Sequence, residues 1–194
     1  MKIESVDIFL LRHSGHSYSD YPFQPAVCRI NTDEGICGFG EAGISIGPAE
    51  NGVAHMLKDL SEMILGKDPL DNEVIWDKLY KCTFWGQNGG PVVFAGISAI
   101  DIALWDIKGK YYKAPVYQLL GGKVRDKLRT YASLLQFGWG QVGVSEHVWA
   151  VTPEDYAHNV KLAIEEGFDA IKIDFFDRDE AGKPLDWLDT TGLL

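Results

Sequence analysis

Residues 1–45 alternate between apolar and polar positions in three short runs, which is the pattern of half-buried β-strands. The runs predict strands at residues 3–11, 26–31 and 36–41. The last two are joined by Thr-Asp-Glu-Gly, a turn sequence with glycine where a positive φ is easiest. The first link, residues 13–25, is long and polar, so we expect it to be mobile or functional. Together these runs predict a three-stranded antiparallel meander.

From residue 49 to residue 112 the apolar positions recur at spacings of three and four, which predicts helices. One apolar stripe covers residues 53–64, and a shorter helix is expected around residues 72–81. After a loop at 84–90, a long helix is predicted over residues 91–112. Small and apolar residues fill the middle of this helix, so we expect it to pack between two layers.

The pattern changes again after the glycine pair at 121–122. Residues 128–134 predict a strand, and residues 169–176 predict a buried strand. Between them a helix begins at Thr152, an N-cap residue followed by proline and two acids, and ends at Gly167. Strand, helix and strand with short joints imply parallel pairing of the two strands.

The predicted fold class is therefore an α+β domain over residues 1–122, followed by the opening of an α/β domain over residues 123–194. Parallel sheets are buried on both faces, and two strands with one helix cannot cover both faces. The tail at 178–194 is mostly polar and contains no complete helix. We expect a part to be missing: further sequence, a partner chain, or nothing at all if the chain is a defective product.

Charge and cysteine content narrow the classes of partner. The formal net charge of −10 argues against nucleic acid and anionic membrane surfaces, although one local cationic site can still hold a small carboxylate. Three cysteines without CxxC spacing predict reduced thiols in a cytoplasmic protein, with Cys28 and Cys37 as two buried thiols rather than a cross-hairpin pair. We expect no signal peptide, and no apolar stretch long enough to cross a bilayer.

One specific motif carries a resemblance to a known family. Residues 96–110 contain Ala-Leu-Trp-Asp and Lys-Gly-Lys, and residues 115–122 follow with Pro-x-x-x-Leu-Leu-Gly-Gly. This run resembles the first signature of the mandelate racemase/muconate lactonizing enzymes of the enolase superfamily, apart from Gly96, where the family has alanine. The opening meander, the run 131–133 and the run 167–174 are also similar to the family, so the resemblance covers essentially the whole chain.

The resemblance implies a capping domain followed by the first βαβ part of a truncated TIM-type (β/α) barrel. Family members remove a proton next to a carboxylate, with Mg²⁺ stabilising the enediolate that forms. Their Mg²⁺ ligands are acids on the third, fourth and fifth barrel strands, so we expect no metal ligands in this chain. The signature's own polar residues, Asp101, Asp106 and Lys108, are interpreted as structural contacts where the cap meets the barrel.

Lys172 and Asp174 are the candidate catalytic residues. Positions i and i+2 of a strand face the same side, so both would point into the barrel mouth. In the family's Lys-x-Lys motif the first lysine contacts the substrate carboxylate and the second is the base. The resemblance therefore gives Lys172 the role of stabilising charge. Asp174 replaces the base lysine, and we interpret it as a proton donor or substrate contact. The simpler alternative is that Lys172 is an ordinary lysine at the end of a strand and that Asp174 is the first residue of a solvated loop.

Two loops resemble the segments that close over substrate in this family. Their hydrogen-bonding and aromatic side chains suit a polyhydroxy acid, and the candidate substrate-binding residues are His13, His16, Tyr18, Trp85, Gln87 and Asn88. For each of them an ordinary solvated loop residue is an equal alternative.

The leading hypothesis is an acid-sugar dehydratase that uses Mg²⁺ and acts on a small carboxylate. Racemase, epimerase or cycloisomerase activity of the same family is the close alternative, because all of them share the first step. A hypothesis of another class is a truncated chain that is catalytically inactive by itself. The resemblance is also compatible with a homo-oligomer.

Overall fold

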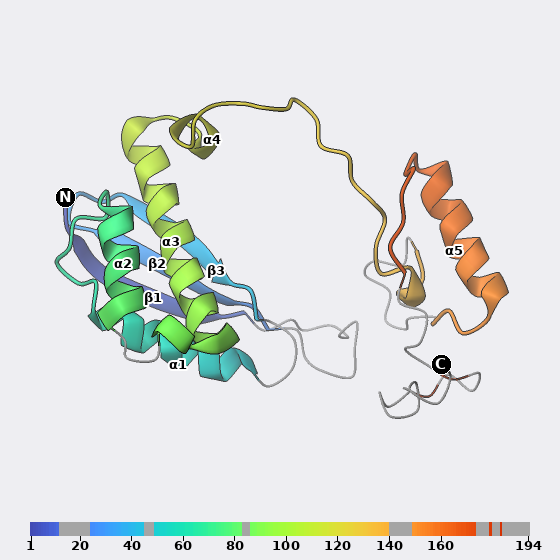
Figure 1. The fold of residues 1–194 in the computed structure, drawn as a ribbon, viewed down its shortest axis with the longest axis horizontal. Helices are drawn as coiled ribbons and strands as arrows, with labels where there is room; N and C mark the ends of the chain where they lie inside the picture. The colour runs from blue at the N-terminus through green and yellow to red at the C-terminus, as the bar shows by residue number, and fades with distance from the viewer. Residues whose placement is uncertain are drawn as a thin grey trace. The chain divides into compact units, whose positions relative to one another are not determined.

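The computed structural model describes residues 1–11, 24–44, 49–82, 86–139, 149–173, 179 and 183, with only the backbone of Asn88 and Phe137. The chain divides into two compact units, Met1–Val124 and Arg125–Leu194, which are described one at a time (Figure 1). Predictions that concern other residues lie outside this part of the chain.

The first unit contains a three-stranded antiparallel sheet in the order β1-β2-β3. Its strands are β1 (Ile3–Leu10), β2 (Ala26–Thr32) and β3 (Cys37–Ala42). In the turn between β2 and β3, Gly35 has a φ of +79°, a conformation that side chains with a Cβ rarely adopt. The predicted meander is confirmed, and each strand ends within one residue of its predicted position.

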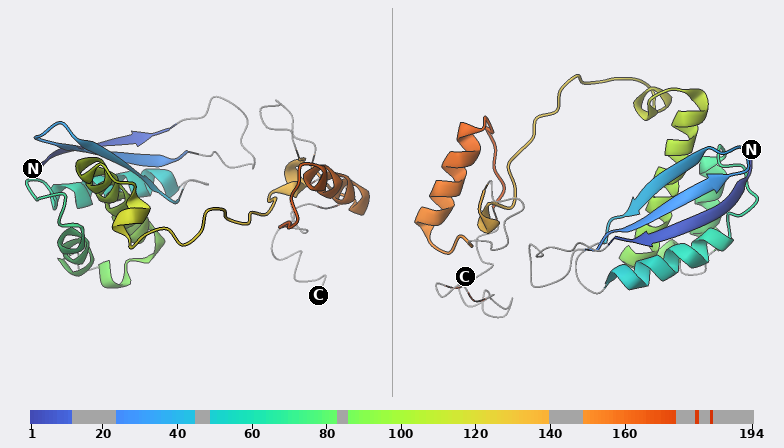
Figure 2. Two further views of the ribbon diagram at one scale, coloured as in Figure 1. Left: turned by 90° about the horizontal axis from the view of Figure 1, so that it is seen from above. Right: turned by 180° about the vertical axis from the view of Figure 1, so that it is seen from behind.

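Three long helices lie on one side of this sheet: two of them pack on the sheet itself, and the middle one in sequence packs on the last (Figure 2). They are α1 (Ala49–Glu62), α2 (Asn72–Cys82) and α3 (Gly90–Tyr112), as the apolar spacing predicts. A single turn, η1 (Gly86–Asn88), precedes α3, and α4 (Val116–Leu119) follows it. The sequence did not predict α4, because four residues are too few to show a helical period.

The core of the first unit fills the space between the sheet and the helices. Large side chains from β2, α1, α2 and α3 lose almost all contact with water there, and they include Ile30, Leu57, Leu60, Ile75, Ile100, Leu104 and Ile107. The long helix α3 packs on the sheet and also contacts α1 and α2, which confirms that it packs on more than one side, between the sheet and α2.

Glycines allow α3 to approach the sheet backbone to backbone. A Cβ added at Gly40 would overlap the carbonyl oxygen of Ala99, and one added at Gly38 would overlap that of Ala103. On the other side of α3, a Cβ at Gly96 would lie 2.9 Å from a Leu60 methyl group. Close packing therefore explains the small residues of the signature.

Helix α3 has 23 residues and a mean hydropathy of 1.5 in its most apolar window, so by length and composition it could cross a membrane. The expectation that no apolar stretch reaches this length is therefore wrong. The structure gives the reason for its composition, because the apolar side chains of α3 form the centre of the core. A buried core helix passes the same test of length and composition as a membrane span.

Two side chains of α3 shield the outer edge of β3. Asp106 accepts a hydrogen bond from the Phe39 backbone N–H at 3.0 Å. The Lys110 ammonium donates to the Cys37 carbonyl and to the Asp106 carboxylate, both at 2.7 Å. Asp106 thus has a structural role, but its described contacts lie within the first unit, and its predicted contact with the barrel stays a prediction. Edge strands with free backbone groups can pair with other chains, and this pair occupies two of those groups.

The cysteines of the described residues are free thiols. Cys28 lies opposite Gly40 and Cys37 lies opposite Asn31, so the hairpin register does not pair the two cysteines. Burial raises the pKa of Cys28 to about 11, whereas Cys37 is only half-buried. The prediction of two buried thiols is therefore right for Cys28 and wrong for Cys37, which lies at the first position of the edge strand β3.

In its described residues the second unit has one long helix, α5 (Pro153–Glu165), and a single turn, η2 (Leu135–Phe137). Ala132 and Ile171 form an isolated parallel bridge. The parallel pairing is as predicted, but in the described residues the strands at 128–134 and 169–176 are reduced to this bridge. Ile171 is 42% exposed, so the prediction of a buried strand is wrong for this residue. By alternation Ile171 lies on the same face as Ile173, so within the described residues the cluster under α5 covers Ile173 but leaves Ile171 partly exposed.

Candidate active site

The backbone of Lys172 is fixed by the parallel bridge. Its N–H donates to the Ala132 carbonyl at 2.7 Å, and the Ala132 N–H donates to the Ala170 carbonyl at 2.9 Å. These two hydrogen bonds hold the segment of Lys172 beside the segment of Ala132 in a defined register. The main chain at the candidate lysine is therefore positioned, even though the described residues around it form a bridge and not a long strand.

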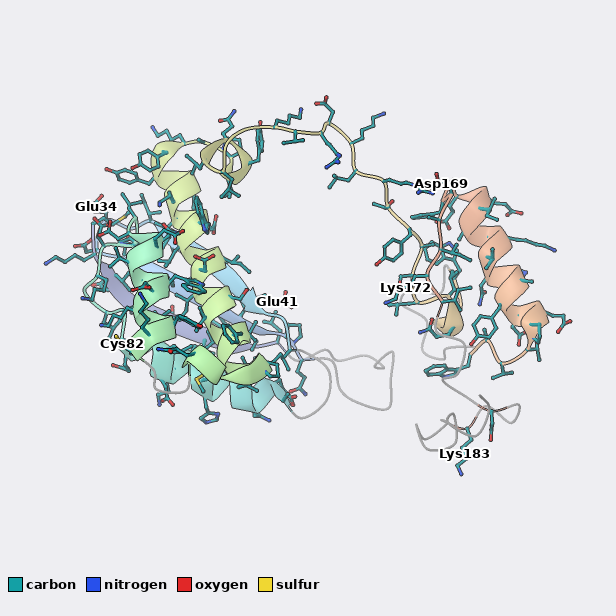
Figure 3. The ribbon with its side chains drawn as sticks, in the orientation of Figure 1. Glu34, Glu41, Cys82, Asp169, Lys172 and Lys183 are labelled. Atoms are coloured by element: carbon teal, nitrogen blue, oxygen red, sulfur yellow. The ribbon has the colours of Figure 1, made fainter. Side chains whose placement is uncertain are left out.

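The side chain of Lys172 points away from α5 (Figure 3). Ala132 is 1% exposed and packs with Leu135 and Ala163, and Ile173 packs against the same cluster. Side chains alternate along an extended segment, so Lys172 must leave on the face opposite to Ile173. Lys172 is exposed on that face. The position of Lys172 inside a barrel stays a prediction.

A capping box fixes the start of α5, which covers the other face. Thr152 accepts from the Asp155 N–H at 3.2 Å, and the Asp155 carboxylate accepts from the Thr152 N–H at 2.9 Å. Hydrogen bonds from the backbone and side chain of Thr152 and from the Val151 N–H lower the pKa of Asp155. At the other end, Gly167 has a φ of +99° and turns the chain toward Lys172. The predicted N-cap and terminating glycine are both confirmed.

The turn after Ala132 is held by the Asn159 side chain of α5. Leu134 has a φ of +63°, an uncommon conformation for a residue with a Cβ, and it leads into η2. The Asn159 amide donates to the Leu135 carbonyl at 2.8 Å, and its oxygen accepts from the Trp139 N–H at 3.4 Å. Asn159 is 7% exposed and its polar atoms have these partners, so it ties η2 to the helix.

The N-terminal end of the two paired segments, before Ala132 and Ile171, carries an ion pair. Arg129 Nε lies 3.1 Å from Oδ1 and 3.2 Å from Oδ2 of Asp169, and Arg129 also donates to the Asp169 carbonyl. A depression of about 400 Å³ lies at this end and is lined by Arg129, Thr130 and residues 166–169. Lys172 is not among its lining residues, so we interpret this end as structural.

The other predicted site residues are placed only in part. His13, His16, Tyr18, Trp85 and Asp174 lie outside the residues that the structure describes. Gln87 is exposed in η1, and the backbone of Asn88 ends the same turn. These two residues belong to the first unit, and each unit is described by itself.

The described residues do not offer a magnesium site. Among them, no group of three or more His, Cys, Asp or Glu side chains could hold a metal ion. Mg²⁺ needs several oxygen ligands in near-octahedral geometry. We therefore route no chemical step through a metal held by this part of the chain.

Sequence reasoning missed two residues on the face of Lys172. Tyr131 and Ser133 flank the buried Ala132, so by alternation they point away from α5, as Lys172 does. The signal was available, because the predicted strand at 128–134 already implies that residues 131 and 133 share one face.

The chain is similar to known proteins over much of its length. Residues 16–121 match the family model of the mandelate racemase/muconate lactonizing enzyme N-terminal domain. A D-galactonate dehydratase from Pectobacterium atrosepticum is 41% identical over 145 residues, which is 75% of this chain and 33% of the relative. A D-galactonate dehydratase from Ralstonia pickettii is 39% identical over 145 residues, again 75% of this chain and 33% of the relative.

Solved structures cover more of the chain. An enolase-superfamily member from Salmonella Typhimurium is 49% identical with a TM-score of 0.85 and covers 94% of this chain and 44% of its own. An enolase from Pantoea ananatis with bound D-gluconate and magnesium is 28% identical with a TM-score of 0.70 and covers 90% of this chain and 36% of its own. The chain thus spans about a third of the length of the curated relatives and less than half of these two solved structures.

Proposed function

This chain belongs to the mandelate racemase/muconate lactonizing enzyme family, and from that membership we propose that it forms the N-terminal domain and the start of the barrel of an acid-sugar dehydratase. The curated relatives named D-galactonate dehydratase support this activity over the other reactions of the family. The relative solved with bound D-gluconate and magnesium supports an acid sugar as substrate and Mg²⁺ as cofactor. A cytoplasmic location and a homo-oligomeric state are part of the proposal.

The position of Lys172 carries the proposal. Its backbone is held by the bridge to Ala132, and its side chain leaves on the face opposite to α5. In a (β/α) barrel the helices surround the strands, so this face is the inner one, where substrates bind at the C-terminal ends of the strands. An ammonium group there can bind the substrate carboxylate and stabilise the charge that develops on it.

The proposed reaction breaks two bonds and releases water. A base removes the proton on the carbon next to the carboxylate, and the hydroxyl on the following carbon leaves with a proton, which gives an enol that rearranges to a 2-keto acid. Mg²⁺, when bound, would supply positive charge at the carboxylate. We propose Asp174 as proton donor or substrate contact, and His13, His16, Tyr18, Trp85, Gln87 and Asn88 as contacts to the sugar hydroxyls.

The described residues supply Lys172 but no set of metal ligands, so we expect the 194-residue chain by itself to show no turnover. A chimera provides the test. Residues 1–194 are joined to the remaining barrel of the Salmonella Typhimurium relative, which is 49% identical over the shared region. The chimera is assayed for 2-keto acid with Mg²⁺ and a panel of acid sugars that includes D-galactonate and D-gluconate.

We expect turnover by the chimera, and a loss of about 10²- to 10³-fold in kcat/KM for Lys172→Ala, the scale seen when one charge-stabilising donor is removed. Lys161→Ala on α5 is the matched control and should keep the activity of the parent chimera. A folded chimera that dehydrates no acid sugar would contradict the dehydratase proposal. An active chimera that tolerates Lys172→Ala would contradict the role of Lys172.

A further inference from the structure

We infer that the first unit pairs with a second copy of this chain, and that the tip of the β2–β3 hairpin of each copy enters a basic hollow of the other. The inference gives a surface to the homo-oligomeric state and rests on that part of the proposed function. It starts from an uneven distribution of charge. The chain has 28 acidic residues, yet none lies between Asp106 and Asp126, a stretch that contains five lysines and arginines.

The basic hollow lies where α3 ends. It has a volume of about 320 Å³ and is lined by Asp106, Lys110, Lys113 and residues 109 and 114–116. Lys110 is paired with Asp106 at 2.7 Å. Lys113 is exposed and has no ion-pair partner among the residues that the structure describes. The hollow therefore keeps one unpaired positive charge above a floor of small and apolar residues.

The backbone conformation of Lys113 is uncommon for a residue with a Cβ. Lys113 follows the last residue of α3 with a φ of +52°, and its N–H donates to the Lys110 carbonyl at 3.2 Å. This left-handed position at a helix end is usually taken by glycine, which has no side chain to clash. A lysine there places an ammonium group at the rim of the hollow in spite of its unfavourable backbone, which favours a role for the charge.

The complementary charge lies at the hairpin tip, which consists of Asp33 and Glu34. Both residues are exposed, and the Glu34 side chain keeps 52% of its surface in water although it pairs with the Met1 ammonium. An ionised carboxylate has about four acceptor positions, so one partner leaves it able to bind another. The tip can therefore offer carboxylate oxygens to a lysine of a second chain.

The hairpin tip and the basic hollow lie at the same end of the first unit. The Lys110 ammonium reaches the carbonyl of Cys37, the first residue of β3, at 2.7 Å. Only two residues separate Cys37 from Glu34, and Figure 3 shows Glu34 at the end of the unit where α3 finishes. Two neighbouring patches of opposite charge permit a two-fold pair, in which each tip meets the hollow of the other copy and every contact is made twice.

This pairing is expected to be weak and sensitive to salt. One exposed ion pair contributes little, but here each copy supplies both partners, and the apolar floor of the hollow strengthens the attraction by excluding water. The net charge of −10 on each copy opposes association in general, so two copies should meet only where opposite charges face each other.

The test measures the mass of the 194-residue chain in solution by light scattering, over a dilution series that starts at about 1 mM so that weak complexes are detected. We expect a dimer at about 0.1 M salt that dissociates near 1 M, because the Debye length falls from about 10 Å to about 3 Å. Lys113→Glu should weaken the dimer about 10-fold or more, since it turns an attraction into a repulsion at two symmetric places. Lys58→Glu, at an exposed position of α1, is the matched control for net charge and should weaken the dimer far less.

The double variant Lys113→Glu/Glu34→Lys separates a direct contact from general damage. Glu34→Lys by itself should weaken the dimer, whereas the exchange of both charges restores the attraction and should return most of the lost affinity. The urea midpoint of each variant checks that it is folded. A chain that is monomeric at low salt, equal weakening by Lys113→Glu and Lys58→Glu, or no recovery in the double variant would overturn the inference.

Failure of this inference can be told apart from failure of the proposed activity. A monomeric chain together with an active chimera would leave the dehydratase proposal standing. A folded chimera without turnover, together with a dimer that responds to Lys113→Glu as expected, would contradict the dehydratase proposal alone.

Discussion

The two units of the chain bury their apolar side chains in different ways. In the first unit, one face of an antiparallel sheet is covered by α1 and α3, α2 packs on α3, and the other face of the sheet can meet water. In the second unit, a parallel pair of segments has α5 on one face, and the opposite face carries Lys172. The first unit therefore completes its own core with local elements, whereas in the described residues of the second unit the face of Lys172 has no covering element.

Most of the buried core and the candidate lysine therefore lie in different units. Large, fully buried side chains are spread over the sheet and three helices of the first unit, whereas in the described part of the second they are limited to Leu135 and Gln136. The candidate lysine lies in the second unit, on the face without a covering helix. Within this chain the first unit holds most of the large buried side chains, and the second carries the lysine proposed to bind the substrate carboxylate.

The largest expected effect is a difference in backbone protection between the two units. Amides in α3 should exchange with deuterium at least ~100-fold more slowly than amides in α5, because opening α3 requires unfolding of the main core, whereas α5 covers a small one. Hydrogen–deuterium exchange with mass spectrometry on the whole chain measures both helices in one experiment. Similar protection in α3 and α5 would show that the second unit has a stable core of its own.

The next effect concerns the close contact that defines the first unit. Gly40→Ala should lower its free energy of unfolding by about 3 kcal/mol, because the added methyl group overlaps the Ala99 carbonyl and the packed helix cannot move away freely. Urea denaturation measures the change. Gly43→Ala is the control, since a Cβ there meets nothing within 4 Å. If both variants unfold at the same urea concentration, α3 packs less tightly on the sheet than described.

The smallest effect is expected at the capping box of α5. Thr152→Ala should weaken the helix by about 1 kcal/mol, and Thr152→Ser should not. The Asp155 pKa is lowered in the folded state, so its contribution is present above its usual pKa and is lost as pH falls through the lowered value. Amide protection of α5 should therefore fall below about pH 4, and Asp155→Asn should remove that step. A step of unchanged size in the Asn variant would assign it to another group.

Much of the fold could be predicted from sequence because the decisive signals were local. The strands of the first unit, its three long helices and the N-cap at Thr152 follow from alternation, helical spacing and capping residues. The apolar run 170–173 misled the prediction, because burial of a strand depends on neighbours that its own sequence does not specify. Whether the two cysteines face each other across the hairpin depends on the strand register, and this register places Cys28 opposite Gly40.

The candidate site, too, could be predicted from the sequence only in part. Lys172 could be found through a family motif, and the structure shows its direction relative to α5. Tyr131 and Ser133 could have been found by alternation along the predicted strand at 128–134. The loop residues, such as His13 and Trp85, stay predictions, because the order of polar side chains in a loop contains no periodic signal that would place them.

The shielding of β3 by Asp106 and Lys110 has a consequence for synthesis on the ribosome. The sheet is complete in sequence at Ala42, but the two side chains that occupy its border are translated roughly 60 residues later, which takes about 3–12 s at ordinary elongation speeds. During that interval a nascent hairpin has an open border that can recruit another chain. The growing polypeptide is therefore most exposed to misassembly before its signature helix emerges, and chaperone contacts would matter most in that interval.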